Sequence, residues 1–147
     1  MSINTDAIGK TYPPDTYAVG REKIKEFAAA VGETLPVHLD PAAARAAGYA
    51  DVVAPPMFAV VYAGRSVIPA LFDPEVGINF AMMVHGSQAF RWGPLVIAGD
   101  EITTTTTVKD IAARAGMGFY EFESNSQNQH GETVCVGTWS HIVRGDA

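Results

Sequence analysis

The sequence predicts an α+β domain in which one antiparallel sheet of about five strands wraps around a central buried helix. Residues 57–72 are apolar nearly all the way round, which is typical of a helix buried on several sides. Four segments between residues 78 and 143 then carry the alternation or the β-branched content of strands. A buried helix needs a covering layer, and the strands that follow it can supply one.

The elements that precede this helix are short. Residues 11–20 are expected to form a loop and a short strand. Residues 21–32 place Ile24, Phe27, Ala28 and Val31 at the i, i+3, i+4, i+7 spacing of an amphipathic helix. Residues 41–47 are expected to form a second, alanine-rich helix, because Asp40 is a good N-cap and Gly48 a natural stop.

The central helix is opened by Pro55 and Pro56, since proline is tolerated in a first helical turn but not in a helix interior. The strands are expected over residues 78–92, 101–111, 116–126 and 132–143. The threonine run at residues 103–107 indicates a half-exposed strand. No linker or internal repeat divides the chain, so residues 1–147 are predicted to form a single domain.

The composition excludes several classes of protein. The net charge of −6 and the dispersed Lys and Arg residues argue against a nucleic-acid-binding surface. The first residues lack the apolar core of a signal peptide, and no apolar run is long enough to cross a bilayer. The lone cysteine, Cys135, excludes an intrachain disulfide and suits a reducing compartment. We therefore expect a cytoplasmic protein without membrane association, and the spacing of its histidines indicates no metal site.

Four short motifs resemble the MaoC-like (R)-specific hydratase and dehydratase family, whose members have the hot-dog fold. The family's site motif, Gly-Asp-x-Asn-Pro-aliphatic-His, lies over GETLPVH at residues 32–38. The segments VAPPMF at residues 53–58, VHG at 84–86 and AGD at 98–100 resemble the branch called the N-terminal MaoC-like, or FAS1-like, dehydratase domain. Residues 11–32 are also similar to that branch, so the resemblance spans nearly the whole chain.

The resemblance implies a substrate class and an assembly. Members of this branch dehydrate (3R)-3-hydroxyacyl thioesters, or hydrate the 2-enoyl forms, on acyl-carrier protein or CoA in fatty acid metabolism. Several form one half of a heterodimer in which the sister hot-dog subunit carries the Asp and His, while the branch member shapes the acyl tunnel. The chain thus resembles one subunit of a (3R)-hydroxyacyl-ACP dehydratase. No cofactor is expected, because the substrate carries its own pantetheine.

The catalytic candidates are His38 and Glu33. Dehydration needs a base for the C2 proton, an acid for the leaving hydroxyl and donors for the thioester oxygen. His38 can exchange protons near neutrality, and Glu33 can orient water or supply a proton. The chain departs from the family motif where Glu33 replaces aspartate and Leu35 replaces asparagine. The same loop can therefore also be a capping loop, with Glu33 solvated and His38 packed beside Asp40.

The candidates for substrate binding lie on the central helix and on the next strand. Met57 and Phe58 carry the first amide N–H groups after the two prolines, where a helix start can offer them to a carbonyl oxygen. Tyr62 is expected to face an acyl or pantetheine channel. His85, with Gly86, is either a tunnel or interface contact or a hydrogen-bonded histidine of the sheet. Its strand face is expected to include Ala81, Met83 and Ser87.

Four functions stay open at this point. The chain is a dehydratase that uses Glu33 and His38, or a subunit that needs a catalytic hot-dog partner. A hot-dog thioesterase is a third possibility, although residues 57–72 lack the acid that many such enzymes carry there. The fourth is an acyl-binding module without turnover. A homodimer or heterodimer with a second hot-dog chain is expected, since a lone hot-dog domain exposes a sheet edge.

Overall fold

The computed structural model describes residues 3–145. The chain forms five strands, three α-helices and three short 3-10 helices within this range. In chain order they are β1 (Asp15–Ala18), α1 (Arg21–Ala30), η1 (Pro36–His38), α2 (Pro41–Ala46), η2 (Pro56–Phe58), α3 (Ala59–Leu71), η3 (Phe80–Met82), β2 (Met83–Trp92), β3 (Glu101–Arg114), β4 (Met117–Gln127) and β5 (Thr133–Val143).

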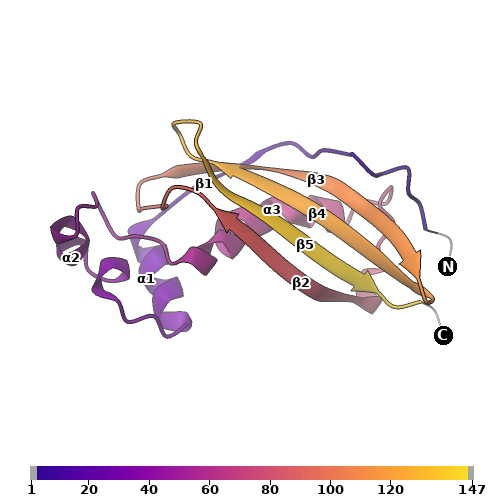
Figure 1. Ribbon diagram of the computed structural model, residues 1–147, viewed down its shortest axis with the longest axis horizontal. Helices are drawn as coiled ribbons and strands as arrows, with labels where there is room; N and C mark the ends of the chain where they lie inside the picture. The colour runs from indigo at the N-terminus through magenta and orange to yellow at the C-terminus, as the bar shows by residue number, and fades with distance from the viewer. Residues whose placement is uncertain (1–2, 146–147) are drawn as a thin grey trace.

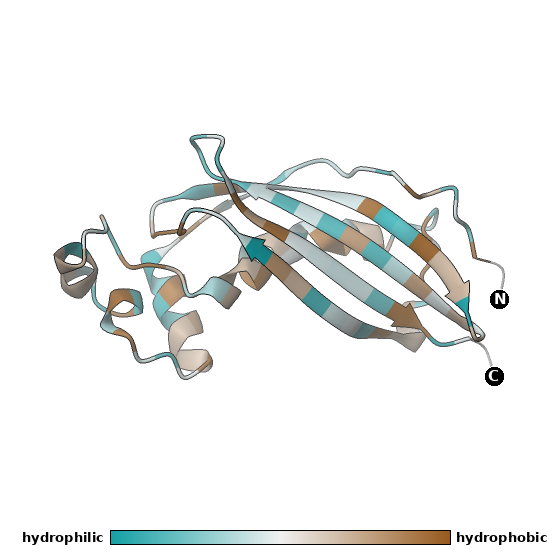
Figure 2. Ribbon diagram, in the orientation of Figure 1, coloured by the Kyte–Doolittle hydropathy of each residue, from teal (hydrophilic) through white to brown (hydrophobic). Residues whose placement is uncertain are grey.

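The strands form one antiparallel sheet in the order β1-β3-β4-β5-β2. β3, β4 and β5 form its long centre, while β1 and β2 are its edges. α3 lies against one face of this curved sheet (Figure 1). Hydrophobic and hydrophilic residues are interspersed along the strands (Figure 2), as expected for a sheet with one covered face. This is the hot-dog arrangement, so the predicted fold class is confirmed.

α3 is buried along one side only. Ile68, on the side away from the sheet, is 50% exposed, and Phe72, just beyond the helix, is 61% exposed. The predicted helix over residues 57–72 is confirmed to within about one residue, as η2 followed by α3, but the prediction that it is buried on several sides is wrong. The α-helix starts after a 3-10 turn, and the sheet covers one of its sides. The side chains that face the sheet, each 2% exposed or less, are Ala59, Tyr62, Ala63, Ser66, Val67 and Ala70.

Small hydroxyl side chains line the sheet where α3 crosses it. Thr104, Thr106, Ser124 and Ser126 are fully buried. The Oγ of Ser66, on α3, lies 2.8 Å from the Thr106 Oγ1, and Thr104 Oγ1 lies 2.8 Å from Ser126 Oγ. These hydrogen bonds satisfy polar atoms that would be costly to bury alone. The threonine run is thus half buried, as predicted, with alternate residues facing the helix.

β2 is interrupted by a β-bulge. His85 pairs with His141 and Ser87 with Ser140, so Gly86 is the extra residue. The bulge leaves His85 on the side of the sheet that faces α3 and turns Ser87 to the opposite side. The prediction that His85 and Ser87 share a face is therefore wrong, because strict alternation assumes an unbroken strand.

The first part of the predicted strand over residues 78–92 is not extended. Phe80–Met82 forms the 3-10 helix η3, and β2 begins only at Met83. The aromatic ring of Phe80 stacks on Phe72 with a centroid distance of 4.6 Å. This contact fastens the start of β2 to the end of α3.

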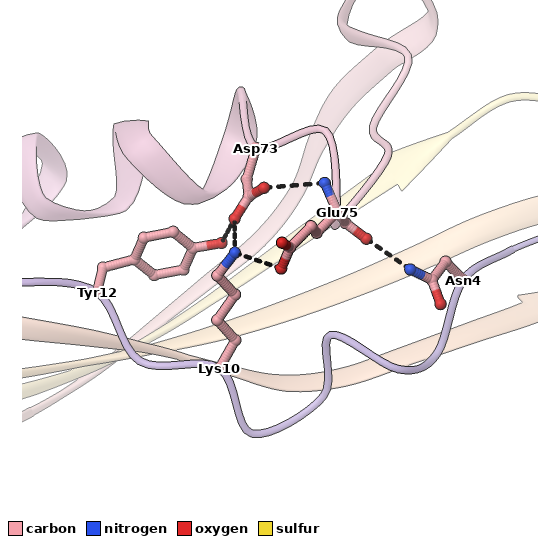
Figure 3. A network of polar contacts seen from close by, with 5 residues as sticks. All are labelled: Asn4, Lys10, Tyr12, Asp73 and Glu75. Atoms are coloured by element: carbon pink, nitrogen blue, oxygen red, sulfur yellow. Dashed lines mark hydrogen bonds and ion pairs between the residues drawn. The ribbon is translucent and has the colours of Figure 1, made fainter.

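A polar cluster ties the N-terminal arm to the end of α3 (Figure 3). Lys10 Nζ lies 2.6 Å from both Asp73 Oδ2 and Glu75 Oε2. The Tyr12 hydroxyl donates to Asp73 Oδ2 at 2.5 Å, and Asn4 Nδ2 donates to the Glu75 carbonyl at 2.8 Å. The Lys10 ammonium, followed by the Tyr12 hydroxyl, lowers the pKa of Asp73 to about 2. We call these five residues the arm cluster.

The helices α1 and α2 lie at one end of the molecule, and the termini lie at the other (Figure 1). The arm cluster belongs to the end that holds the termini. No helix within residues 3–145 is long and apolar enough to span a bilayer.

Candidate functional site

An extended segment, residues 52–54, joins three parts of the molecule. On one side, the Val53 N–H donates to the Val37 carbonyl at 2.9 Å. On the other side, the Ala54 N–H donates to the Val96 carbonyl at 2.8 Å. The segment then continues through two prolines into α3. It therefore connects the GETLPVH loop, the β2–β3 connection and the start of the central helix, and we call this region the junction.

His38 is buried in the junction, with 7% of its surface exposed. Its Nδ1 lies 2.6 Å from the Val53 carbonyl oxygen. Because a carbonyl oxygen only accepts hydrogen bonds, Nδ1 carries a proton, and the tautomer with a lone pair has it at Nε2. None of the residues that the structure describes forms a hydrogen bond with Nε2. The ring is thus fixed by a backbone carbonyl rather than by Asp40, and one nitrogen is left for proton exchange.

Glu33 lies near His38 but is hydrogen-bonded to its own loop. Its Oε1 accepts the backbone N–H of Thr34 at 2.8 Å and that of Leu35 at 2.9 Å. The bond from Leu35, then that from Thr34 and more weakly the charge of His38 lower the pKa of the Glu33 carboxyl. A carboxyl that ionises more readily than usual is a poor proton donor to a leaving hydroxyl. The geometry therefore gives Glu33 a loop-capping contact.

An apolar pocket of about 340 Å³ lies between the start of α3 and the end of β2. Its inner wall contains Ala59, Tyr62 and Val134, which are each 2% exposed or less. Its rim contains Trp92 and Leu95, which are 50% and 54% exposed. The other lining residues are Ala54, Pro55, Pro56, Gly93, Pro94 and Val96. Because prolines have no N–H, much of the wall offers no donor, and the pocket suits an apolar group.

Trp92 bridges the rim of the pocket. Its Nε1–H donates to the Pro56 carbonyl oxygen at 2.9 Å, which connects the end of β2 to the turn before α3. The Pro56 carbonyl and the Met57 N–H belong to one planar peptide group. The bond from Trp92 therefore also fixes the direction in which the Met57 N–H points.

The structure separates the two amide candidates at the helix start. The Phe58 N–H donates to the Pro55 carbonyl at 2.8 Å, and the Phe58 ring is fully buried, 5.5 Å from the Phe27 ring. Met57 is 47% exposed, and its N–H forms no hydrogen bond within the described part of the chain. Met57 is therefore the one of the two whose amide can meet a ligand.

Tyr62 lies in the inner wall of the pocket. Its ring is tilted against Phe58 at a centroid distance of 6.2 Å. Burial, together with the contact to the Cys135 thiol, raises the pKa of Tyr62 above its usual value, so the phenol stays protonated. Its neighbour on the next helical turn, Ser66, points elsewhere, since its hydroxyl is bonded to the sheet.

His85 and Gly86 lie toward the opposite end of β2 from the pocket. The His85 ring stacks on His141 at 4.9 Å, and its Nε2 lies 3.0 Å from the Ser87 carbonyl. Burial and the neighbouring His85 lower the pKa of His141 to about 4. A Cβ at Gly86 would lie 3.0 Å from the side chain of Ile142, so a larger residue there would require Ile142 to shift. These are contacts within the sheet.

The carboxylate of Asp100, from the AGD segment, is also hydrogen-bonded to residues of the surrounding turns. Its Oδ2 accepts the Ile97 N–H at 2.9 Å, and its Oδ1 accepts from Gln129 Nε2 at 2.9 Å. It holds the turn that leads into β3. Within residues 3–145, no group of three or more His, Cys, Asp or Glu side chains could hold a metal ion.

Sequence reasoning missed the rim of the pocket. Trp92, Pro94 and Leu95 belong to a stretch that the pattern assigns to a strand end and a connection. The Trp-Gly-Pro-Leu run was the available signal, since large apolar residues stand beside a turn. This run predicts a turn, but it does not predict that the turn packs against the start of α3.

Known proteins give this geometry a family context. Residues 6–136 match the family model described as "FAS1-like, dehydratase domain region". A UPF0336 protein from Clavibacter michiganensis is 46% identical, over 99% of this chain and 99% of that protein.

Two solved structures share the architecture. A chain of the C-terminally truncated HadBC (3R-hydroxyacyl-ACP dehydratase) complex from Mycobacterium tuberculosis is 27% identical, with a TM-score of 0.83 over 95% of this chain and 99% of that chain. The R-hydratase PhaJ1 from Pseudomonas aeruginosa shares the fold at 19% identity, with a TM-score of 0.74 over 95% of this chain and 83% of that chain.

Proposed function

Because the chain belongs to the family of the FAS1-like dehydratase domain region, we propose that it is a subunit of a hot-dog dehydratase for acyl thioesters. The reaction would remove water from a (3R)-3-hydroxyacyl thioester or, in reverse, hydrate the 2-enoyl form. The observation that carries this proposal is the apolar pocket at the junction, whose lining residue Ala54 directly follows Val53, the residue whose carbonyl holds His38. The carrier would be CoA or acyl-carrier protein, and the protein would need no cofactor of its own.

The groups at the junction match the parts of such a substrate. The pocket would take the acyl tail, and the Met57 N–H would donate to the thioester oxygen as charge develops on it. In the reaction, a base removes a proton from C2, that electron pair forms the C2–C3 double bond, and the hydroxyl leaves C3 with a proton as water. His38 Nε2 is the atom of this chain that could take or return a proton.

A second candidate function is favoured by the state of Glu33. Its carboxylate accepts hydrogen bonds from two backbone N–H groups. Leu35 stands where the family motif has asparagine; its side chain is 57% exposed and has no amide group. On this candidate, the chain builds the acyl pocket, and a partner hot-dog subunit supplies the Asp and His. The HadBC dehydratase is itself described as a complex, which supports an assembly of this kind.

The partner would dock along β2. β2 is an edge strand of the sheet, and its side chains Val84 and Trp92 are 45% and 50% exposed. A strand edge with exposed apolar side chains is a template for another strand. Either a second copy of this chain or a sister hot-dog subunit would cover this edge.

The test is hydration of crotonyl-CoA, followed by the loss of enoyl absorbance. The chain is assayed alone and together with a hot-dog subunit that has an intact Asp and His, each with wild type, His38→Ala and Glu33→Gln. Turnover by the chain alone that is lost in His38→Ala establishes the catalytic function, and a parallel loss in Glu33→Gln would add Glu33 to the catalytic groups. Turnover only with the partner, unchanged by both substitutions, establishes the second candidate. No turnover in either arrangement overturns the proposal.

A further inference from the structure

We propose that Tyr62 limits the length of the acyl chain that the pocket accepts. The inference rests on the proposed function, because it places the acyl tail of the thioester in the pocket. It adds a specificity-determining residue to that site, and it makes a claim about chain length that neither the fold nor the junction geometry makes.

Tyr62 is the bulkiest side chain of the buried inner wall. Its neighbours in that wall, Ala59 and Val134, are smaller, and all three are 2% exposed or less. A chain that enters from the exposed rim, past Trp92 and Leu95, therefore meets the phenol ring at the inner end of the pocket. The depth of the pocket is set by this ring more than by any other side chain in the wall.

The ring of Tyr62 is also held in place. It packs against Phe58 at 6.2 Å, and Phe58 in turn packs edge-on against Phe27 at 5.5 Å. The whole side chain of Tyr62 is 2% exposed. A close-packed core resists the movement of a buried ring that packs against a second aromatic ring. The inner end of the pocket is therefore rigid and cannot swing open for a longer chain.

The test is a calorimetric titration of the full chain with saturated acyl-CoAs of increasing length. Each methylene that enters the pocket is expected to tighten binding about 4-fold. The gain is expected to stop once the terminal carbon reaches Tyr62. In Tyr62→Ala, this break moves to longer chains, and the longest acyl-CoAs bind roughly 10-fold tighter than to wild type. Tyr62→Leu is the second variant, because it shortens the wall with a smaller loss of core volume.

The matched control is Tyr62→Phe, which keeps the ring and removes only the hydroxyl. Its break is expected at the wild-type length. A change in tryptophan fluorescence on acyl-CoA binding that is seen in wild type and lost in Trp92→Phe, which keeps Trp139, reports that the acyl chain enters at the rim.

A break that stays in place in both Tyr62→Ala and Tyr62→Leu overturns the inference. Binding that shows no dependence on chain length in wild type also overturns it. Crotonyl-CoA turnover separates these outcomes from a failure of the proposed function, because a four-carbon chain does not test the end of the pocket. Turnover with an unmoved break removes only the role of Tyr62, whereas no turnover and no acyl-CoA binding removes both.

Discussion

The two ends of the molecule differ in how fully their buried polar groups are hydrogen-bonded. In the arm cluster, Asp73 accepts hydrogen bonds from Lys10, Tyr12 and the backbone N–H of Glu75. The side chain of Glu75 forms a second ion pair with Lys10. At the junction, by contrast, His38 uses one ring nitrogen on a backbone carbonyl, and no described residue bonds to the other. A cluster in which every group is bonded holds segments together, whereas a group with bonding capacity left over beside a pocket can meet a ligand.

A perturbed pKa alone would point to the wrong end. The pKa of Asp73 is lowered to about 2, and this shift comes from Lys10 and Tyr12 within the arm cluster. Glu33 also has a lowered pKa, but it comes from backbone N–H groups of its own loop. Ion pairs and caps perturb titration without any function. The pocket and the free nitrogen of His38 distinguish the junction better than either shift.

The largest expected effect is on stability, at the arm cluster. Asp73→Ala should lower the free energy of unfolding by about 2 kcal/mol, because it leaves the Tyr12 hydroxyl, in a residue 8% exposed, without its acceptor. Urea unfolding measures this change. Glu75→Gln is the control, with an expected loss below about 0.5 kcal/mol, since that side chain is 70% exposed. Equal losses in the two variants would mean that the buried bond to Tyr12 contributes nothing.

The next effect is on turnover, at the junction. Trp92→Phe keeps an aromatic ring at the rim but removes the bond to the Pro56 carbonyl that fixes the Met57 N–H. We expect kcat for enoyl hydration to fall about 10-fold, with a smaller change in KM, because a misdirected donor stabilises the transition state less well. Leu95→Ala, at the same rim, should instead raise KM. If kcat is unchanged in Trp92→Phe, the Met57 amide does not contact the reacting thioester.

A pH series sharpens the contrast between the two ends. The pKa of Asp73 is about 2 in the folded protein, below its usual 3.8, so the unfolded chain binds its proton first as the pH falls. Its contribution to stability is complete above about pH 4 and is lost progressively toward pH 2. Urea unfolding between pH 5 and pH 2 should show a shallower decline for Asp73→Asn than for wild type. The Arg21 guanidinium also lowers the pKa of Asp51 to about 2. Because Asp51 is present in both proteins, it does not affect the difference between their unfolding curves. Parallel curves would refute the assignment.

The smallest expected effect is at Glu33. In Glu33→Gln, the amide oxygen can still accept the N–H groups of Thr34 and Leu35, but without the negative charge that strengthens these bonds, so the melting temperature should fall only slightly. Turnover with a catalytic partner should stay within about 2-fold of wild type. A fall of about 100-fold would instead identify Glu33 as an acid or a base in the reaction.

The fold followed from local pattern, because each of its main elements has its own period. The apolar run after Pro55 and Pro56 predicted the central helix, and the β-branched run before Val108 predicted β3. The N-cap prediction at Asp40 is also confirmed, since its Oδ1 accepts the Ala42 N–H at 3.0 Å. Such contacts span a few residues, so the sequence contains most of what decides them.

The candidate site depended on contacts that span longer stretches of chain. The pocket forms because Trp92 reaches Pro56, which is 36 residues away. The partner of His38 is the carbonyl of Val53 rather than Asp40, and the bulge at Gly86 reverses the alternation in half of β2. No periodicity encodes a pairing at this distance or the insertion of one residue into a ladder.

The central claim is that the junction handles the acyl thioester and that the arm cluster only supports the fold. The most direct measurement is the initial rate of crotonyl-CoA hydration, by the chain alone or together with a catalytic hot-dog subunit, whichever arrangement turns over. The rate is compared for Trp92→Phe and Asp73→Asn at a temperature where both are folded. The account predicts a lower rate for Trp92→Phe and the wild-type rate for Asp73→Asn. A wild-type rate for Trp92→Phe together with a loss of rate in folded Asp73→Asn would contradict it.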